Sequence, residues 1–583
     1  MTMYHGHKRN RLYRYVFTLI VVISGCLSTH TQATKPLDKT GLPATLTPFL
    51  TLPSLTSLAG LPTGNPTDTS TPSPIKTPSP IPSRTTTPTN TTGPTNLPAT
   101  QTGTIRPSET PLPSSTSPIS IPTKTIRPSR TPRPSRTASP TSMPTETASP
   151  SDTPTPFPTN SPIQAPMMGT ESHSLKLAYV DLIKAANLTW VRRNAYLWSY
   201  VEPTEGERYW AGMAGLEKDM ETGSANGIQN ILIVRSTPSW AQKVRGVYCG
   251  PVLREKFGAF ASFMHDLVAR LSVPPYNVKY WELGNEPDVD PSLVPPDSVY
   301  GCWGDKDDLY YGGQYYGEML SVIYPAIKSA DPEAQVLIGG LLLDCDPENP
   351  PAGRDCTPSL FFNGILQNGG GEYFDIVSYH GYAYYNGQLS TSEKLPNWAP
   401  RGGQVIGKFL YLRETLQNYG YNKPIYITEA SLICTEKDLI HCNPPGDPFF
   451  EAQADYAVML FARNWAFNLN GTIWFDFEAG WRWSSMLDKY HQPKPVYNSV
   501  KFFMQELDQA ILTQPIGQYP QLNGYEFVLA DKRVWVLWAV DDVPHTITLP
   551  DNLMHIYDKY GVEISPTNGT LTLQSPVYIE LSP

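Results

Sequence analysis

Proline is concentrated in one part of this chain. Half of its 60 prolines lie between residues 31 and 170, whereas all 13 tryptophans lie after residue 165. From residue 35 to 165 proline alternates with Ser and Thr, and aromatic side chains are almost absent. Such a stretch cannot bury enough apolar surface to offset the entropy lost on ordering it. We therefore predict a disordered linker over residues 27–165 and a folded region over 166–583.

Residues 1–26 have the organisation of an export signal. Four basic residues precede an apolar run, Tyr15 to Ile23, that is too short to span a bilayer. The run ends in Ile23-Ser24-Gly25-Cys26, which resembles the lipobox of bacterial lipoproteins. That resemblance implies that a lipid on Cys26 anchors the protein to a membrane. The alternative is an ordinary cleaved signal peptide with an incidental Cys. Both predict a protein outside the cytoplasm, lipid-anchored at the cell surface or secreted.

The folded region is acidic, with 48 Asp and Glu against 30 Lys and Arg. An acidic surface repels phosphate backbones, and the sequence contains no basic stripe. We therefore predict no nucleic-acid partner. A neutral or weakly charged partner, such as a carbohydrate, suits a composition rich in tyrosine and tryptophan.

Six cysteines lie in the folded region, which suits an oxidising compartment. The sequence alone does not choose among the possible pairings. Proximity favours Cys345 with Cys356 and Cys434 with Cys442, which leaves Cys249 with Cys302. A zinc site is the alternative, but the sequence has neither a CxxC pair nor an HExxH helix. We predict disulfides and no metal site.

Short β-branched runs alternate with helix-like stretches from residue 166 to 510. We predict eight strands, over 166–169, 189–193, 231–235, 278–283, 335–339, 375–379, 424–428 and 471–475. Helical segments between them include 175–186, 253–271, 315–329 and 451–469, and the longer ones have apolar residues at spacings of three and four. This pattern predicts a (β/α)₈ barrel, in which reactive residues follow the C-terminal ends of the strands.

After residue 510 the helical pattern stops and period-two alternation begins. Short runs such as Arg533-Val534-Trp535-Val536-Leu537-Trp538 are separated by Asp, Asn and Gly turns. These features predict a small antiparallel β-sandwich over residues 511–583. We expect it to pack against the barrel; a carbohydrate-binding module is the alternative role.

Acidic residues follow two of the predicted barrel strands. Trp281-Glu282-Leu283-Gly284-Asn285-Glu286-Pro287 comes at the fourth strand, and Ile427-Thr428-Glu429-Ala430-Ser431 comes at the seventh. Two carboxylates at these strand ends face each other across the barrel mouth. The first motif resembles the Asn-Glu-Pro signature of clan A glycoside hydrolases, which carry catalytic glutamates on strands four and seven. The resemblance covers residues 166 to about 510 and leans toward family 39 or its neighbours, such as family 5.

The resemblance implies roles for further residues. Glu286 is the acid/base, Glu429 is the nucleophile, and Asn285 hydrogen-bonds the sugar 2-hydroxyl. Arg192, at the end of the second strand, keeps the nucleophile ionised; strand alternation allows only one of Arg192 and Arg193 to point inward, and we favour Arg192. Other residues that the resemblance places in the pocket are His380, Tyr382 and Trp474, the last as the floor on which the sugar stacks. Trp240, Trp481 and Trp483 are weaker stacking candidates. We interpret Glu282 and Asp288 as solvated.

Two carboxyls in opposite protonation states suffice to cleave a glycosidic bond, without a metal or cofactor. The sequence therefore predicts an extracellular glycoside hydrolase that retains anomeric configuration, without indicating the sugar or the linkage. One alternative is a cell-surface, lectin-like protein that kept the barrel and lost turnover. Another is a metal-dependent barrel hydrolase.

Overall fold

The computed structural model describes residues 162–583, except 195–196, 296–297, 299–300 and 436. The predicted export signal with Cys26, and the linker as far as residue 161, lie outside the described residues. Within the described part of the chain, no helix is both long and apolar enough to cross a bilayer.

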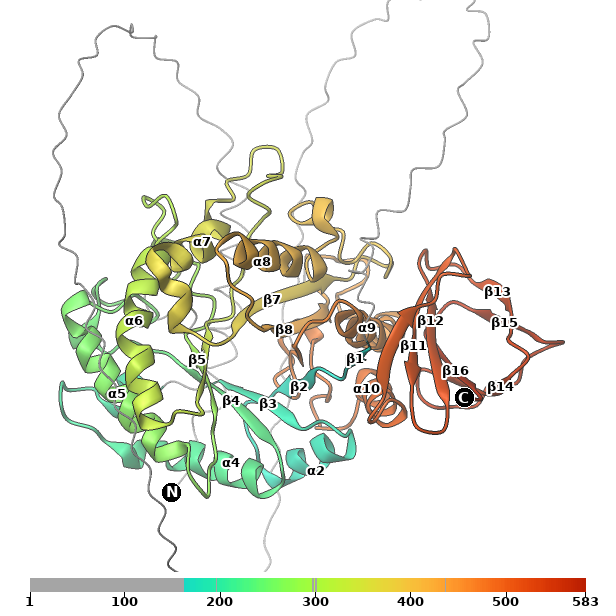
Figure 1. Cartoon of the computed structure of the whole chain (residues 1–583), viewed down its shortest axis with the longest axis horizontal. Coiled ribbons are helices and arrows are strands. Elements are labelled where there is room, and N and C mark those ends of the chain that lie inside the picture. The colour runs from blue at the N-terminus through green and yellow to red at the C-terminus, as the bar shows by residue number, and fades with distance from the viewer. Residues whose placement is uncertain (1–161, 195–196, 296–297, 299–300, 436) are drawn as a thin grey trace, which may run out of the picture. The chain divides into compact units, whose positions relative to one another are not determined.

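Eight parallel strands form the central sheet (Figure 1). They are β2 (Met167–Glu171), β3 (Trp190–Asn194), β4 (Gln229–Val234), β5 (Tyr280–Leu283), β6 (Gln335–Ile338), β7 (Val377–Tyr384), β8 (Ile425–Ile433) and β9 (Gly471–Trp474). Their order is β6-β5-β4-β3-β2-β9-β8-β7. Parallel bridges Leu337↔Ile376 and Leu341↔Tyr379 join the two edges, so the sheet closes into a barrel. All eight predicted strands are confirmed.

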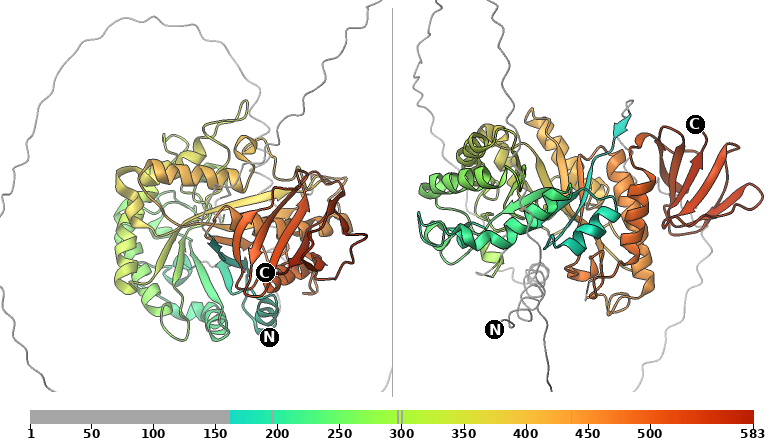
Figure 2. Two further views of the ribbon diagram at one scale, coloured as in Figure 1. Left: turned by 45° about the vertical axis from the view of Figure 1, so that its right-hand side comes forward. Right: turned by 90° about the horizontal axis from the view of Figure 1, so that it is seen from below.

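Helices lie outside the strands (Figure 2). The main ones are α2 (Leu177–Ala185), α4 (Ala214–Ala225), α5 (Phe257–Leu271), α6 (Gly313–Ala330), α7 (Phe361–Leu366), α8 (Ile406–Asn418), α9 (Asp447–Ala466) and α10 (Pro495–Glu506). In α5, Phe260, Phe263, Met264 and Leu267 are buried, as their spacing of three and four residues predicts. Burial of such a stripe against the sheet stabilises these helices more than intrinsic propensity does.

Apolar side chains fill the barrel interior. Ile231, Leu337, Ile376, Tyr426 and Ile473 form a separate buried cluster, and they come from, or directly precede, different strands. Ile231 of β4 and Ile473 of β9 both lie before the C-terminal residue of their strand. The interior is therefore a packed core rather than a pore, and polar chemistry is left to the C-terminal ends of the strands.

Two antiparallel sheets follow the barrel. One has the order β1 (Ile163–Gln164), β10 (Ile511–Pro515), β11 (Leu522–Val528), β12 (Arg533–Ala539), β16 (Val577–Leu581) and β14 (Leu553–Asp558). The other pairs β13 (His545–Thr548) with β15 (Thr570–Leu573). Trp535, Leu537, Ile547, Leu571 and Ile579 share one core, so the sheets pack face to face and the predicted sandwich is confirmed. Strand β1 lies within the region that we predicted to be a disordered linker. The prediction is wrong for these two residues, because they pair with β10.

The sandwich packs against the barrel through α9. The rings of Trp465 and Phe527 are 5.0 Å apart edge to face, with both side chains buried. Lys559 Nζ lies 2.7 Å from Asp455 and 2.8 Å from Glu451, both on α9. Apolar burial and ion pairs therefore join the two parts, as we expected of a packing domain.

Candidate active site

Glu286 and Glu429 meet in one buried site. Glu429 lies on β8, and Glu286 follows β5 in the left-handed region, with φ of 53°. The β7–β8 register places His380 beside Glu429. Its Nδ1 lies 3.0 Å from Glu286 Oε1 and 3.4 Å from Glu429 Oε2. The side chains of Glu286 and Glu429 are only 4% and 7% exposed. The two carboxyls are therefore close enough to act on one bound atom.

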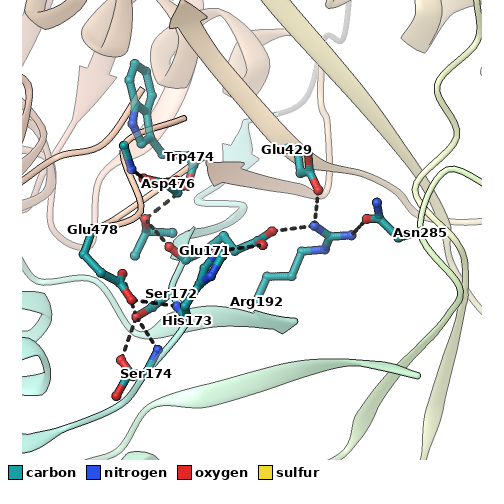
Figure 3. Close-up of polar contacts among 12 residues, drawn as sticks. Glu171, Ser172, His173, Ser174, Arg192, Asn285, Glu429, Trp474, Asp476 and Glu478 are labelled. Atoms are coloured by element: carbon teal, nitrogen blue, oxygen red, sulfur yellow. Dashed lines mark hydrogen bonds and ion pairs between the residues drawn. The ribbon is translucent and has the colours of Figure 1, made fainter. Parts of the chain in front are cut away.

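Arg192 links the carboxylates of several strands (Figure 3). It lies on β3 and is fully buried, and all three nitrogens of its guanidinium donate hydrogen bonds. Nε donates to Glu282 Oε2 at 2.6 Å, and Nη2 donates to Asn285 Oδ1 at 2.6 Å. Nη1 donates to Glu429 Oε1 and to Glu171 Oε2, each at 2.5 Å. Arg192 thus fixes the position of Glu429 by a charge-assisted hydrogen bond.

Arg193 points to the opposite face of β3. Its guanidinium pairs with Asp219 of α4, with Nη2 3.0 Å from Oδ2. The strand alternation expected from the sequence is confirmed, because Arg192 is the arginine that points into the barrel.

Tyr382 and Asn285 complete the immediate surroundings of Glu429 and Glu286. The Tyr382 hydroxyl donates to Glu429 Oε2, so both oxygens of Glu429 accept hydrogen bonds. The Asn285 side-chain oxygen is occupied by Arg192, which orients the amide. The amide NH₂ of Asn285 is the group left to donate to a ligand hydroxyl.

Burial gives the two glutamates different proton affinities. Burial, the charge of Glu429 and the charge of Asp288 raise the pKa of Glu286 well above its usual range, and Arg192 and Lys408 only partly oppose this. Burial raises the pKa of Glu429 to about 7, although Arg192 and the Tyr382 hydroxyl lower it. Burial, together with the positive charges of Arg192 and Lys408, lowers the pKa of His380 well below its usual range. Glu286 therefore holds a proton more tightly than Glu429, beside a neutral imidazole.

The interpretation of Glu282 and Asp288 as solvated is wrong. Glu282 is fully buried and accepts hydrogen bonds from Arg192, Ser378 and Thr428. Asp288 accepts from the backbone N–H groups of Leu342 and Leu343, and it too is buried. Glu282 lies on a short strand whose alternate side chains point inward, so period-two alternation could have found it.

Glu171 is a buried acid of the site to which the sequence motifs did not point. It is the last residue of β2, is fully buried, and contacts Arg192. The signal that would have found it is its place at a strand end, the criterion that singled out Glu286 and Glu429.

The stacking role expected of Trp474 is not compatible with its burial. Its side chain is fully buried in the main core, and its indole N–H donates to the carbonyl of Ser484 at 3.0 Å. A ring without exposed surface has no face to offer a sugar. The ring of the next residue, Phe475, contacts the ring of Tyr382 edge to face, with 5.8 Å between the ring centroids. The ring of Trp481 also contacts Tyr382, with 5.3 Å between the centroids. Phe475 and Trp481 are therefore aromatic residues that lie beside Tyr382, whose hydroxyl bonds to Glu429.

Trp240 lies in a different cluster. It follows β4 in a short helical turn, packs edge to face against Trp198 at 5.4 Å, and donates to the carbonyl of Glu202 at 3.0 Å. Lys256 lies over its ring. The contacts that hold Trp240 in place are with these residues rather than with either site glutamate.

Disulfides join the loops that follow the barrel strands. The pairs Cys249–Cys302, Cys345–Cys356 and Cys434–Cys442 are formed, so the pairing that proximity favoured is confirmed. The first pair connects the loop after β4 to the loop after β5, which carries Glu286. The other two close the loops after β6 and β8. Disulfides thus constrain loops at the C-terminal ends of the barrel strands.

Gly340 leaves the space that His380 occupies. A Cβ at residue 340 would lie 2.0 Å from His380 Nε2 and 2.6 Å from Cδ2. We expect Gly340→Ala to displace His380 from Glu286 and to destabilise the fold by about 1–3 kcal/mol, the usual cost of overpacking. Thermal unfolding measures this change. Gly215→Ala is the control, because nothing lies within 4 Å of a Cβ at that helical position. Equal melting temperatures for the two variants would contradict the prediction.

Glu286, His380 and Glu429 could also hold a metal ion. One ligand atom from each residue lies within 4.8 Å of the others, and all three side chains are buried. A neutral imidazole with two carboxylates is a donor set that transition metals accept. The geometry therefore permits both metal-free acid/base chemistry and metal binding.

Comparison with known proteins supports the fold. No protein-family model and no curated protein matches the chain. A family 39 glycoside hydrolase from Bacteroides cellulosilyticus WH2 superimposes with a TM-score of 0.54 at 19% identity, over 72% of this chain and 81% of that one. A conserved exported protein from Bacteroides fragilis gives 0.52 at 14% identity, over 72% and 98%. The chain therefore shares the barrel fold of a family 39 glycoside hydrolase.

Proposed function

We propose that this protein is a retaining glycoside hydrolase that acts on carbohydrate outside the cytoplasm. The observation that carries the proposal is the meeting of Glu286 and Glu429 at one imidazole nitrogen, with different proton affinities. Ligand atoms within 4.8 Å suit the carboxyl separation of about 5–5.5 Å found in retaining enzymes. The fold shared with a family 39 glycoside hydrolase agrees with this function.

In the first step Glu429 attacks the anomeric carbon while Glu286 gives its proton to the leaving oxygen. A glycosyl ester with Glu429 forms and the glycosidic C–O bond breaks. In the second step Glu286, now ionised, takes a proton from water, and the water oxygen displaces Glu429. Arg192 and Tyr382 hold Glu429 in position through both steps. We assign Asn285 to the sugar 2-hydroxyl through its amide NH₂.

The test is hydrolysis of a panel of aryl glycosides and of plant and microbial polysaccharides, with the product anomer followed by NMR. Retention of configuration is the expected result. Net inversion would remove the nucleophile role of Glu429, even if cleavage occurred.

The pKa values predict a bell-shaped pH profile. Glu429 must be ionised to attack, so kcat/KM should rise as pH increases through its pKa of about 7. Glu286 must be protonated to donate, so kcat/KM should fall at higher pH, where its raised pKa is passed. Measurement of kcat/KM against pH checks both limbs. Activity that declines from about pH 5 upward would contradict this assignment.

A metal-dependent hydrolase is the second candidate, because the same three residues could hold an ion. Chelator treatment separates the candidates. Full activity after removal of bound metal is expected of the two-glutamate mechanism, whereas loss of activity restored by an added divalent cation would favour the metal.

We further propose that the protein is exported and held at a membrane by a lipid on Cys26. Three disulfides in the described part of the chain support an oxidising location. The resemblance of residues 23–26 to a lipobox supports the anchor.

A further inference from the structure

A cavity of about 580 Å³ lies where the barrel meets the sandwich. Helices α9 and α10 lie between the barrel strands and the sandwich (Figure 1). The lining of the cavity includes Asn498, Lys501, Phe502 and Gln505 of α10, Glu451 of α9 and Tyr560 of the turn after β14. These residues lie outside the barrel strands, so the cavity is separate from the site of Glu286 and Glu429. Its volume is in the range of pockets that bind small ligands.

The polar residues of α10 form one row along the cavity. Asn498, Lys501 and Gln505 are three and four residues apart, so they lie on the same face of the helix. The row spans seven residues, which is roughly 10 Å along the helix axis. Gln505 Nε2 donates to the carbonyl of Ala185 at 3.2 Å, so its amide oxygen remains to accept from a ligand. The row therefore offers donors and acceptors to a ligand that carries several hydroxyls.

Tyr560 lines the cavity from the sandwich and is held in place by its contacts. Its hydroxyl donates to Glu451 Oε2 at 2.8 Å, and its backbone N–H donates to Asp558 Oδ1 at 2.8 Å. The next residue, Gly561, approaches α10 so closely that a Cβ there would lie 2.5 Å from Phe502 Cδ2. Tyr560 itself is only partly buried. A ring that is positioned before binding and partly exposed offers apolar surface to a ligand at a small entropic cost.

The charges around the cavity balance. Glu451 and Lys501 line it, and Lys559 Nζ lies 2.8 Å from Glu451 Oε2 and 2.7 Å from Asp455 Oδ1. Two lysines and two acids leave no net charge, so the cavity does not favour a strongly anionic or cationic ligand. A peptide helix would need an apolar groove, whereas polar side chains run along this face of α10. A neutral ligand with many hydroxyls fits this combination.

We propose that this cavity is a second carbohydrate site, which binds a segment of a neutral polysaccharide without cleaving it. The partly exposed ring of Tyr560 contacts the C–H face of a sugar. Asn498, Lys501 and Gln505 bond to hydroxyls along the same segment. Binding here does not depend on the proposed hydrolase function, but its use does: a polymer held at this cavity stays close to the barrel between cleavage events.

Affinity electrophoresis of the full chain tests the binding. The native gels contain arabinoxylan, galactomannan or mixed-linkage β-glucan, and Glu429→Gln is the parent of every variant so that the polymer is not degraded. We expect at least one polysaccharide to retard the parent. Tyr560→Ala in this background should raise the dissociation constant about fivefold, because a polymer that spans both sites loses an aromatic contact at one of them.

Tyr519→Ala in the same background is the matched control. Tyr519 is also a partly buried tyrosine of the sandwich with a bonded hydroxyl, which donates to the carbonyl of Thr548 at 2.8 Å, but it does not line the cavity. Its retardation should equal that of the parent. The inference is overturned if no gel retards the parent, if folded Tyr560→Ala binds like the parent, or if Tyr519→Ala loses as much affinity as Tyr560→Ala.

Asn498→Ala covers the case in which Tyr560→Ala does not fold. The Asn498 side chain is exposed on α10, so its truncation spares the core. We expect the dissociation constant to rise about threefold, the effect of losing one hydrogen bond. In that case an unchanged constant in Asn498→Ala overturns the inference.

Hydrolysis separates this inference from the proposed function. With Glu429 intact, Tyr560→Ala should raise KM for the retarding polysaccharide about fivefold and leave kcat/KM on a short aryl glycoside unchanged. If Tyr560→Ala weakens binding but the natural protein cleaves no glycoside, the hydrolase function fails and the second site stands. If glycosides are cleaved and folded Tyr560→Ala is retarded like its parent, the second site fails and the hydrolase function stands.

Discussion

Glu429→Gln is expected to lower kcat on an aryl glycoside by a factor on the order of 10⁴ or more, the scale seen when an enzyme loses its nucleophile. KM, or ligand affinity measured directly, should change little. The reason is that glutamine has nearly the same shape and can still contact Arg192 and Tyr382, but it cannot form the glycosyl ester.

A matched control shows whether the loss of kcat is a general effect of replacing a buried glutamate. Glu526 lies in the β-sandwich, is 5% exposed, and accepts from the indole N–H of Trp535. Glu526→Gln should leave kcat unchanged. A second variant, Glu429→Ala, opens space for azide, which should restore turnover and give a glycosyl azide of inverted configuration.

The lectin-like alternative predicts a different pattern. Glycan would bind equally well to the parent protein and to Glu429→Gln, and neither would release product from any glycoside. Such a result would remove the catalytic assignment of both Glu286 and Glu429.

Arg192→Met is expected to destabilise the protein by about 3–5 kcal/mol, the usual cost of leaving buried charges without their partner. Arg192 contacts Glu171, Glu282 and Glu429, and its side chain is fully buried. Without it, these carboxylates must take up protons or remain charged in a medium of low polarity. Chemical denaturation and thermal unfolding near neutral pH measure the change.

Arg193→Met is the control one residue along the same strand. Arg193 and Asp219 are 15% and 14% exposed, so water shares in stabilising both charges. We expect a loss of no more than about 1 kcal/mol for this pair. Equal losses of unfolding free energy at the two arginines would show that the buried carboxylates around Arg192 do not depend on its charge.

The strand pattern of the sequence predicted part of the site. Each candidate glutamate followed a predicted strand, and period-two alternation separated Arg192 from Arg193. The stacking role of Trp474 came from the family resemblance instead, and it is wrong. Ile473 lies in the cluster inside the barrel, and the next residue of β9, Trp474, lies in the main core. Phe475 took the position beside Tyr382 instead.

The sequence by itself determined the barrel, the sandwich and the strand ends that carry Glu286 and Glu429, because these depend on local periodicity and chain order. Only the tertiary structure decided which charges are buried together. Glu171, Glu282 and Glu429 lie 21, 90 and 237 residues from Arg192, yet all contact its guanidinium. Burial and Coulomb interactions depend on distance in space, so no local pattern specifies that one arginine is shared among three carboxylates.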